Sequence, residues 1–177
     1  MQRIMIIGCC GSGKSTLASK LQAITALPLF HLDQYYWKPN WTETPKEEWE
    51  DIVKGLSQKD NWIIDGNYGG TIDVRFDRAD TIVYMDISTL KCLGRVIGRV
   101  WKYHGNVRPD MPEGCKERFD LDFIHYVATY NLLRRKKLLF KLDKLKNEKQ
   151  IITIKNQTDI NTFLEEIKSH FLNSKER

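Results

Sequence analysis

One short segment near the start of the chain limits its possible folds more than any other. Residues 8–15 read GCCGSGKS and match the pattern Gly-x-x-x-x-Gly-Lys-Ser/Thr. The apolar run 3–7 precedes this segment, and Leu17, Leu21 and Ile24 follow it at helical spacing. A strand, a glycine-rich turn and a helix in this order form a phosphate-binding loop, with backbone N–H groups facing an anion. The sequence therefore predicts an α/β protein with a phosphate site after its first strand.

Short apolar runs recur along the chain, and amphipathic helical patterns separate them. The runs are residues 3–7, 27–32, 62–64, 81–85 and 151–154. They are continuous rather than alternating, which is typical of strands covered on both faces of a parallel sheet. Strand and helix in alternation predict βαβ units, and we interpret residues 1–177 as a single domain.

The stretch 90–150 departs from this alternation. Both of its ends look helical, but the middle, from Gly105 to Gly114, contains Pro109 and Pro112. Prolines and glycines interrupt helices. We expect a helix, an insert and a second helix here, with a lid over about 95–120.

Composition excludes several classes of protein. The 177 residues are 41% hydrophobic and 11% aromatic, enough for a packed core. No apolar run approaches the ~20 residues of a membrane helix, and the run 3–7 is too short for a secretory signal. The four cysteines lack CxxC or framework spacing, so we expect reduced thiols and a cytoplasmic location.

The net charge of +5 is unevenly divided along the chain. Residues 1–90 hold 9 basic and 12 acidic side chains, whereas residues 91–177 hold 19 basic and 11 acidic ones. A basic half is compatible with nucleic acid, an anionic membrane surface or a small polyanion.

The residues of the loop have separate expected roles. The predicted nucleotide-binding set is Gly8, Gly11, Ser12, Gly13, Lys14, Ser15 and Thr16. Glycines let the backbone turn toward phosphate oxygens, and the lysine reaches the β- and γ-phosphates. Ser15 is an expected ligand of Mg²⁺. We interpret Cys9 and Cys10 as small residues that fill space.

Two aspartates follow predicted strands at the carboxyl edge of the sheet. Asp33 can accept a proton from an acceptor hydroxyl or hold a Mg²⁺-bound water, although an Asx turn is the structural alternative. Asp65 ends the third apolar run, as a carboxylate that holds Mg²⁺ through water does. The aromatic residues 35–37 either stack on a ligand or belong to the core, and Asn67 and Tyr68 are candidates for the acceptor pocket.

Two basic segments have more than one interpretation. Arg95 and Arg99 lie one helical turn apart and are expected to stabilise the transferring phosphoryl group, the alternative being a solvated helix face. Residues 134–149 hold eight basic and two acidic side chains. Three interpretations of this segment are open. It is an amphipathic helix whose basic side is solvated, or it contributes Arg134 or Arg135 to a phosphate site, or it binds nucleic acid.

The guanine motif Asn-Lys-x-Asp of GTPases is absent from the sequence, and motor ATPases usually need a longer chain. Small phosphotransferases are therefore the leading class.

Longer strings resemble a known family. They are RIMIIG..GSGKST, HLDQYYWKPNW, ETPKEEW, WIIDGNYGGT, R.DRADTIVYMD and RPDMPEGC.ERFDL.F. Over residues 1–140 the chain resembles the adenylate-kinase-related, FlaR-like DNA topology modulation proteins. The resemblance implies a nucleoside-kinase-like three-layer α/β/α fold with a core five-stranded parallel sheet and a helical lid, and ATP as donor.

The string at Asp65–Tyr68 departs from the Asp-Gly-Phe-Pro-Arg of true adenylate kinases, which argues against AMP as acceptor.

The sequence thus predicts an ATP- and Mg²⁺-dependent kinase of a small molecule. Its predicted catalytic residues are Lys14, Asp33, Arg95 and Arg99, and its predicted substrate residues are Asp33, Tyr36, Tyr68 and Arg75. The alternatives are a nucleotide-gated DNA-binding protein and a plain nucleotide hydrolase. No membrane partner is expected.

Overall fold

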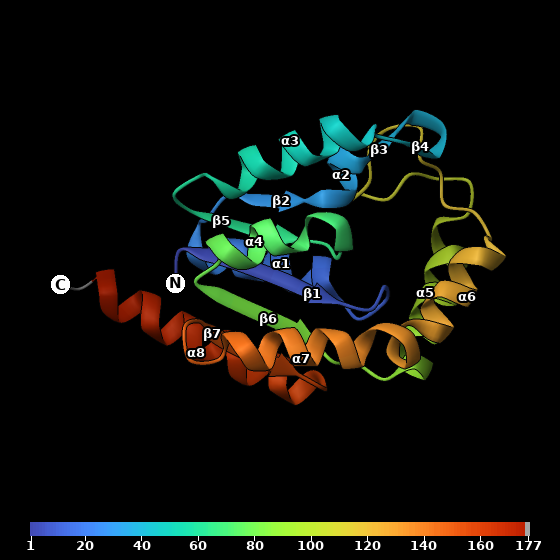
Figure 1. Ribbon diagram of the computed structural model, residues 1–177. Coiled ribbons are helices and arrows are strands. Elements are labelled where there is room, and N and C mark those ends of the chain that lie inside the picture. The colour runs from blue at the N-terminus through green and yellow to red at the C-terminus, as the bar shows by residue number, and fades with distance from the viewer. Residues whose placement is uncertain (176–177) are drawn as a thin grey trace.

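A five-stranded, entirely parallel sheet forms the centre of the molecule (Figure 1). The computed structural model describes residues 1–175, with side chains described as far as residue 171. In spatial order the strands are β2 (Leu29–His31), β5 (Trp62–Asp65), β1 (Arg3–Gly8), β6 (Thr81–Met85) and β7 (Gln150–Ile154). All five predicted apolar runs are strands, which confirms the parallel sheet expected from the sequence.

The middle strands are apolar along their whole length because helices cover both faces of the sheet. Ile4, Met5, Ile6 and Ile7 of β1 are each completely buried. Since alternate side chains of a strand point to opposite faces, Ile4 and Ile6 enter one core and Met5 and Ile7 enter the other. The two cores make three layers, as predicted.

Two sets of helices form the outer layers. On one face lie α1 (Lys14–Thr25), α5 (Thr89–Tyr103), α6 (Leu121–Tyr130) and α8 (Gln157–Lys175). On the other face lie α3 (Lys46–Ser57), α4 (Ile72–Arg78) and α7 (Lys136–Leu145). In Figure 1, α3 lies at the top and α7 at the bottom of the view, with α4 between them.

The expected helix, insert and helix are present between residues 89 and 145. Residues 104–120 contain only two isolated β-bridges, between His104 and Glu117 and between Val107 and Lys116. The helical character expected of the lid is therefore confined to the flanking α5 and α6, and α5 includes the first part of the range 95–120. A π-helical turn, η3 (Asn131–Arg135), joins α6 to α7.

A small cap follows β2 and faces the irregular segment. It consists of α2 (Leu32–Tyr36), a two-stranded antiparallel hairpin of β3 (Trp37–Lys38) and β4 (Thr42–Glu43), and the 3₁₀ turn η1 (Pro39–Trp41) between them. The Trp41 indole N–H donates to the Lys116 carbonyl at 2.9 Å, and the Asn40 N–H donates to the Gly114 carbonyl at 3.3 Å. The insert therefore rests on the cap across the opening.

Two further expectations concern membrane-spanning helices and the state of the cysteines. Within residues 1–175 no helix combines the length and the apolar character that crossing a membrane requires. All four cysteines are free thiols.

The terminal helix provides a test of this architecture. Phe163 of α8 is only 4% exposed and packs in the core shared with α1. Phe163→Ala should lower the free energy of unfolding by about 3–5 kcal/mol, because it leaves a cavity between helix and sheet. Glu166→Ala, on the exposed side of the same helix, should change it by less than about 0.5 kcal/mol. Urea denaturation measures both, and equal effects would contradict this packing.

Candidate functional site

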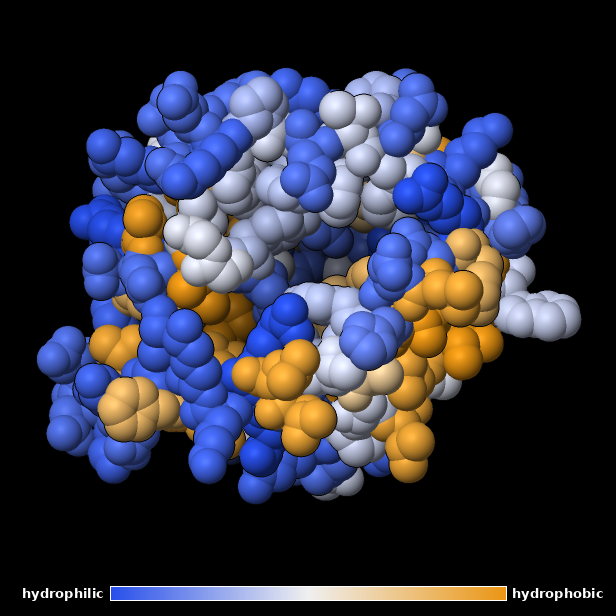
Figure 2. Space-filling model, turned by 45° about the vertical axis from the view of Figure 1, so that its right-hand side comes forward, coloured by the Kyte–Doolittle hydropathy of each residue, from blue (hydrophilic) through white to orange (hydrophobic). Residues whose placement is uncertain are grey.

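The polar residues of the predicted site meet at the carboxyl edge of the sheet. Gly8, His31 and Asp65 end β1, β2 and β5, and His31 lies beside Asp65 in the strand register. His31 and Asp65 border a cavity of about 1110 Å³, which residues of the insert and of α7 line from other sides. Figure 2 shows a face of the molecule that is hollowed near its centre. This position agrees with the rule that parallel α/β sheets bind ligands outside the carboxyl ends of their strands.

The backbone of the phosphate-binding loop requires glycine at two points. Gly8 and Gly11 have positive φ angles of 148° and 79°. A Cβ atom would lie 2.6 Å from the Met85 carbonyl oxygen at Gly8 and 2.5 Å from the Cys92 carbonyl oxygen at Gly11. The loop is thus pressed against the end of β6 and the start of α5, with no room for a side chain.

Asn67 holds the loop from the other side. Its Nδ2 donates to the Gly8 carbonyl at 2.7 Å, and its Oδ1 accepts from the Gly8 N–H at 3.0 Å. One amide therefore satisfies both backbone groups of the residue at which strand becomes loop. The sequence marked Asn67 only as a candidate for the acceptor pocket.

Lys14 lies at the base of the loop and faces the cavity. Its Nζ donates to the Cys9 carbonyl at 3.1 Å. Burial opposes its charge, but Cys10, Asp65 and Asp33 outweigh that effect and raise the pKa of Lys14. The residue is therefore a cation at neutral pH, as the binding of a polyphosphate requires.

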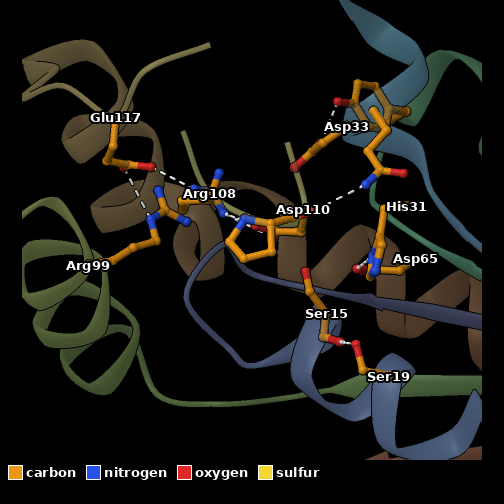
Figure 3. A network of polar contacts seen from close by, with 12 residues as sticks. Ser15, Ser19, His31, Asp33, Asp65, Arg99, Arg108, Asp110 and Glu117 are labelled. Carbon is orange, nitrogen blue, oxygen red and sulfur yellow. Dashed lines mark hydrogen bonds and ion pairs between the residues drawn. The ribbon is translucent and has the colours of Figure 1, made fainter. Parts of the chain in front are cut away.

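Asp65 has one satisfied and one unsatisfied carboxylate oxygen. Oδ2 lies 3.0 Å from Nδ1 of His31, and Oδ1 is buried without a hydrogen-bond partner among the described residues. Burial opposes protonation of His31, but Asp65 outweighs it and raises the pKa of His31. Figure 3 shows this pair beside the helix that carries Ser15.

The residues present fit a Mg²⁺ ion. The orphaned Asp65 Oδ1 is an acceptor for a metal-bound water, and Ser15 offers a hydroxyl at the same cavity. Mg²⁺ usually keeps several waters and takes few protein ligands. This agrees with the finding that, over the described residues, no group of three His, Cys, Asp or Glu side chains is arranged to hold a metal.

Asp33 and Tyr68 form a second polar pair. The Tyr68 hydroxyl donates to Asp33 Oδ1 at 2.5 Å, and both residues line the cavity. Burial raises the pKa of Asp33, and Asp65 adds to this effect, whereas the Tyr68 hydrogen bond opposes it. Burial and the neighbouring Asp33 raise the pKa of Tyr68, so its hydroxyl stays protonated. Asp33 is thus an oriented carboxylate with an elevated pKa, a property suited to a general base.

Arg75, predicted to contact substrate, acts elsewhere. The side chain is completely buried and does not line the cavity. Its guanidinium donates to the carbonyls of Gly66, Asn67 and Tyr68 at 2.6, 2.5 and 3.1 Å. Tyr68 has a φ of 34°, which is strained for a residue with a side chain. Arg75 therefore stabilises the loop that presents Asn67 and Tyr68, and its assignment to substrate is corrected.

Tyr36 is also set back from the cavity. Its ring lies 5.0 Å from Trp49 and 4.7 Å from Tyr68, centroid to centroid. It belongs to the aromatic cluster behind Tyr68, so the structure favours the core interpretation. Trp37 and Trp41 of the cap line the cavity instead.

The predicted lid arginines already have partners. Arg95 donates to the Ser12 carbonyl at 2.9 Å, so it bears on the phosphate-binding loop. Arg99 Nε lies 3.2 Å from Glu117, and Arg108 Nε lies 2.6 Å from the same carboxylate. Arg108 also pairs with Asp110 at 3.0 Å (Figure 3). The insert thus carries its own carboxylates against these cations, a pairing that motif reading missed.

The two cysteines of the phosphate-binding loop, Cys9 and Cys10, have environments that disfavour thiol reactivity. Cys9 is 1% exposed, and a hydrogen bond with Cys92 together with burial raises its thiol pKa. Burial likewise raises the pKa of Cys10. Since the thiolate is the reactive form, both shifts disfavour thiol chemistry.

Two solved kinases have a similar fold. A gluconokinase from Sinorhizobium meliloti 1021 superposes with a TM-score of 0.51 at 13% identity, covering 99% of this chain and 94% of its own. A shikimate kinase from Bacteroides thetaiotaomicron superposes with a TM-score of 0.53 at 14% identity, covering 95% and 97%. The chain has the P-loop kinase-like fold. No protein-family model matches it, and a comparison with curated protein sequences finds no match.

Most predicted residues of this P-loop kinase-like chain face one cavity. Lining it are Gly11, Gly13, Lys14, Ser15, Thr16, Asp33, Asp65, Tyr68, Arg95 and Arg99. Gly8, Ser12, Tyr36 and Arg75 do not line it. Sequence patterns assigned no role to His31, Glu117 or Tyr126, whose partners Asp65, Arg99 and Arg134 lie at spacings that no motif marks.

The contact between loop and α5 generates a prediction. Gly11→Ala should destabilise the fold by about 1–3 kcal/mol, because the new methyl would meet backbone in a left-handed conformation. Gly94→Ala is the matched control, since nothing lies within 4 Å of its Cβ position and alanine favours helix. Chemical denaturation measures both. A Gly11→Ala protein as stable as Gly94→Ala would contradict the geometry.

Proposed function

We propose that the protein is an ATP-dependent phosphotransferase that acts on a small molecule. One observation carries the proposal: Lys14, the orphaned oxygen of Asp65 and the oriented carboxylate of Asp33 border the same cavity. The fold shared with small-molecule kinases supports it. Identities of 13% and 14% support the fold alone, so the activity rests on the site.

Each residue has a definite task in this proposal. The loop amides and Lys14 bind the triphosphate, and Ser15 and Asp65 would hold Mg²⁺, which neutralises phosphate charge when bound. Asp33 accepts the proton of the acceptor hydroxyl, while Tyr68 keeps its carboxylate oriented. Arg95 supports the loop through the Ser12 carbonyl. The contact of the insert with the cap narrows the access of water to the cavity.

A nucleic-acid role receives less support. Half of the basic residues in 134–149 are engaged by this chain: Arg135 with Asp86, Lys141 with Asp73, Lys146 with Asp143, and Lys149 with two carbonyls. Contacts within the chain thus hold half of the basic side chains in this segment and reduce its free basic face. The resemblance to FlaR-like proteins stays a prediction from the sequence.

Lys14 tests nucleotide binding. Lys14→Ala should weaken Mg-ATP binding about 10–100-fold, because a charge-assisted contact to phosphate is lost. Lys20→Ala, on the exposed face of the same helix, should bind normally. Isothermal titration calorimetry measures both. Unchanged affinity in Lys14→Ala would overturn the assignment of the loop, and ATP loss that no acceptor accelerates would identify a hydrolase.

The Asp33–Tyr68 pair predicts a pH dependence. The base is active as a carboxylate, so kcat/KM should fall as pH falls through the Asp33 pKa, which lies above the ordinary 3.8. Tyr68→Phe removes a hydrogen bond that favours the charged form, so the acidic limb should move to higher pH. Tyr35→Phe, at an exposed position outside the cavity, should leave it in place. A limb that stays put or moves to lower pH in Tyr68→Phe would contradict the pairing.

A further inference from the structure

One wall of the cavity consists of basic side chains that the proposed mechanism does not use. Arg134 of η3 and Lys137 and Lys141 of α7 line the cavity together with Leu133 and Leu138. Their spacing of three and four residues places the three cations on one side of a helix. The helix α7, which carries Lys137 and Lys141, is the orange helix at the bottom of Figure 1.

The π-helical turn η3 contains two neighbouring arginines, Arg134 and Arg135, that have different partners. Arg135 makes a two-pronged ion pair with Asp86 beyond β6, with both N–O distances at 2.8 Å. Arg134 instead places its guanidinium 4.5 Å from the ring centroid of Tyr126, which lines the cavity. Single π-helical turns often occur at functional sites. Here the turn lets Arg135 anchor the helix while Arg134 faces the cavity.

Among the described residues, Arg134 and Lys137 are the two cavity arginines and lysines that have neither an ion pair nor a hydrogen bond to a loop carbonyl. Arg99 and Arg108 share Glu117, Arg118 lies 3.7 Å from Asp120, and Lys141 lies 2.5 Å from Asp73. Lys14 and Arg95 are held by loop carbonyls. Among the side chains that the structure describes, no carboxylate is within ion-pair distance of Arg134 or Lys137. Both side chains are exposed, so an anion that enters the cavity can approach them.

The position of these cations favours the acceptor over the nucleotide. The Lys141–Asp73 ion pair joins α7 to the start of α4, directly after the turn η2 (Gly69–Thr71). Gly69 and Ile72 line the cavity there, next to Tyr68 and its partner Asp33. The basic wall is therefore joined to the segment that carries Tyr68, whose hydroxyl orients the proposed base Asp33. A cavity of about 1110 Å³ has room for a second ligand beside a triphosphate.

We propose that the acceptor carries an anionic group, a carboxylate or a phosphate, which Arg134 and Lys137 bind while its hydroxyl faces Asp33. This inference rests on the proposed kinase function and names the class of its acceptor. Binding the anion at one end orients the hydroxyl at the other, which is how a remote charge contributes to phosphoryl transfer. Neutral polyols of the same carbon skeleton lack this contact.

The test compares matched acceptors. Three-, five- and six-carbon polyols are measured beside the corresponding aldonates and monophosphates, by calorimetric binding without nucleotide and by Mg-ATP-dependent product formation. Anionic members should bind and react at least about tenfold better than their neutral counterparts. Comparison of the aldonates with the monophosphates identifies the anion. Equal binding of neutral and anionic members, or no binding of any anion, would overturn the proposal.

Variants assign the effect to residues. Arg134→Gln and Lys137→Gln should each raise the KM and the Kd for the anionic acceptor about tenfold and leave the KM for ATP unchanged. Lys136→Gln, an exposed neighbour that does not line the cavity, should change neither. A rise in the KM for ATP in place of that for the acceptor would overturn the proposal.

Two further readouts separate this inference from its competitors. A short DNA duplex is titrated against the same variants, and loss of duplex binding with unchanged acceptor binding would assign the wall to nucleic acid and overturn the proposal. Failure of the wild-type chain to bind Mg-ATP would count against the kinase function alone. Acceptor binding measured without nucleotide would still decide the role of Arg134 and Lys137.

Discussion

The whole site depends on how the backbone of Gly8 and its following loop is held. Asn67 satisfies both backbone groups of Gly8, and the Met85 and Cys92 carbonyls close against the glycines at positions 8 and 11. These contacts come from the loop after β5, from β6 and from α5, so the loop takes its shape only when the sheet is assembled. The positive φ angles are tolerated because glycine has no Cβ. A rigid loop of this kind presents its N–H groups to phosphate without reorganisation.

A second buried support repeats the same principle on the acceptor side. Arg75 donates to three successive carbonyls and stabilises the strained backbone at Tyr68. Strain of this kind persists only where surrounding contacts outweigh it. The hydroxyl of Tyr68 then orients Asp33. A residue predicted to touch substrate thus acts through another, since a completely buried guanidinium is better placed to satisfy carbonyls than to meet a ligand.

Many basic side chains in the second half of the chain are paired within the folded protein, so they do not form a free basic surface. Several of its charges close ion pairs within the chain, such as Arg135 with Asp86 and Arg108 with Glu117. Others hold backbone, as Arg95 does at the Ser12 carbonyl. Arg134 and Lys137 are left over at the cavity, which is why we assign them to an anionic ligand. Counts of charge in a sequence do not distinguish these uses, because each depends on which partner lies within about 4 Å.

The sequence by itself determined the five strands, the parallel sheet and the phosphate-binding loop. Their signals are local: continuous apolar runs, helical spacing and Gly-x-x-x-x-Gly-Lys-Ser within eight residues. It also placed Asp33 and Asp65 at the sheet edge, because Asp65 ends β5 and Asp33 comes two residues after the end of β2. Only the tertiary structure decided that Asn67 clamps Gly8, that Arg75 faces inward and that Glu117 pairs with Arg99 and Arg108. Those pairs join residues 59, 18 and 9 positions apart for Asn67, Arg99 and Arg108, too distant for local spacing to bring together.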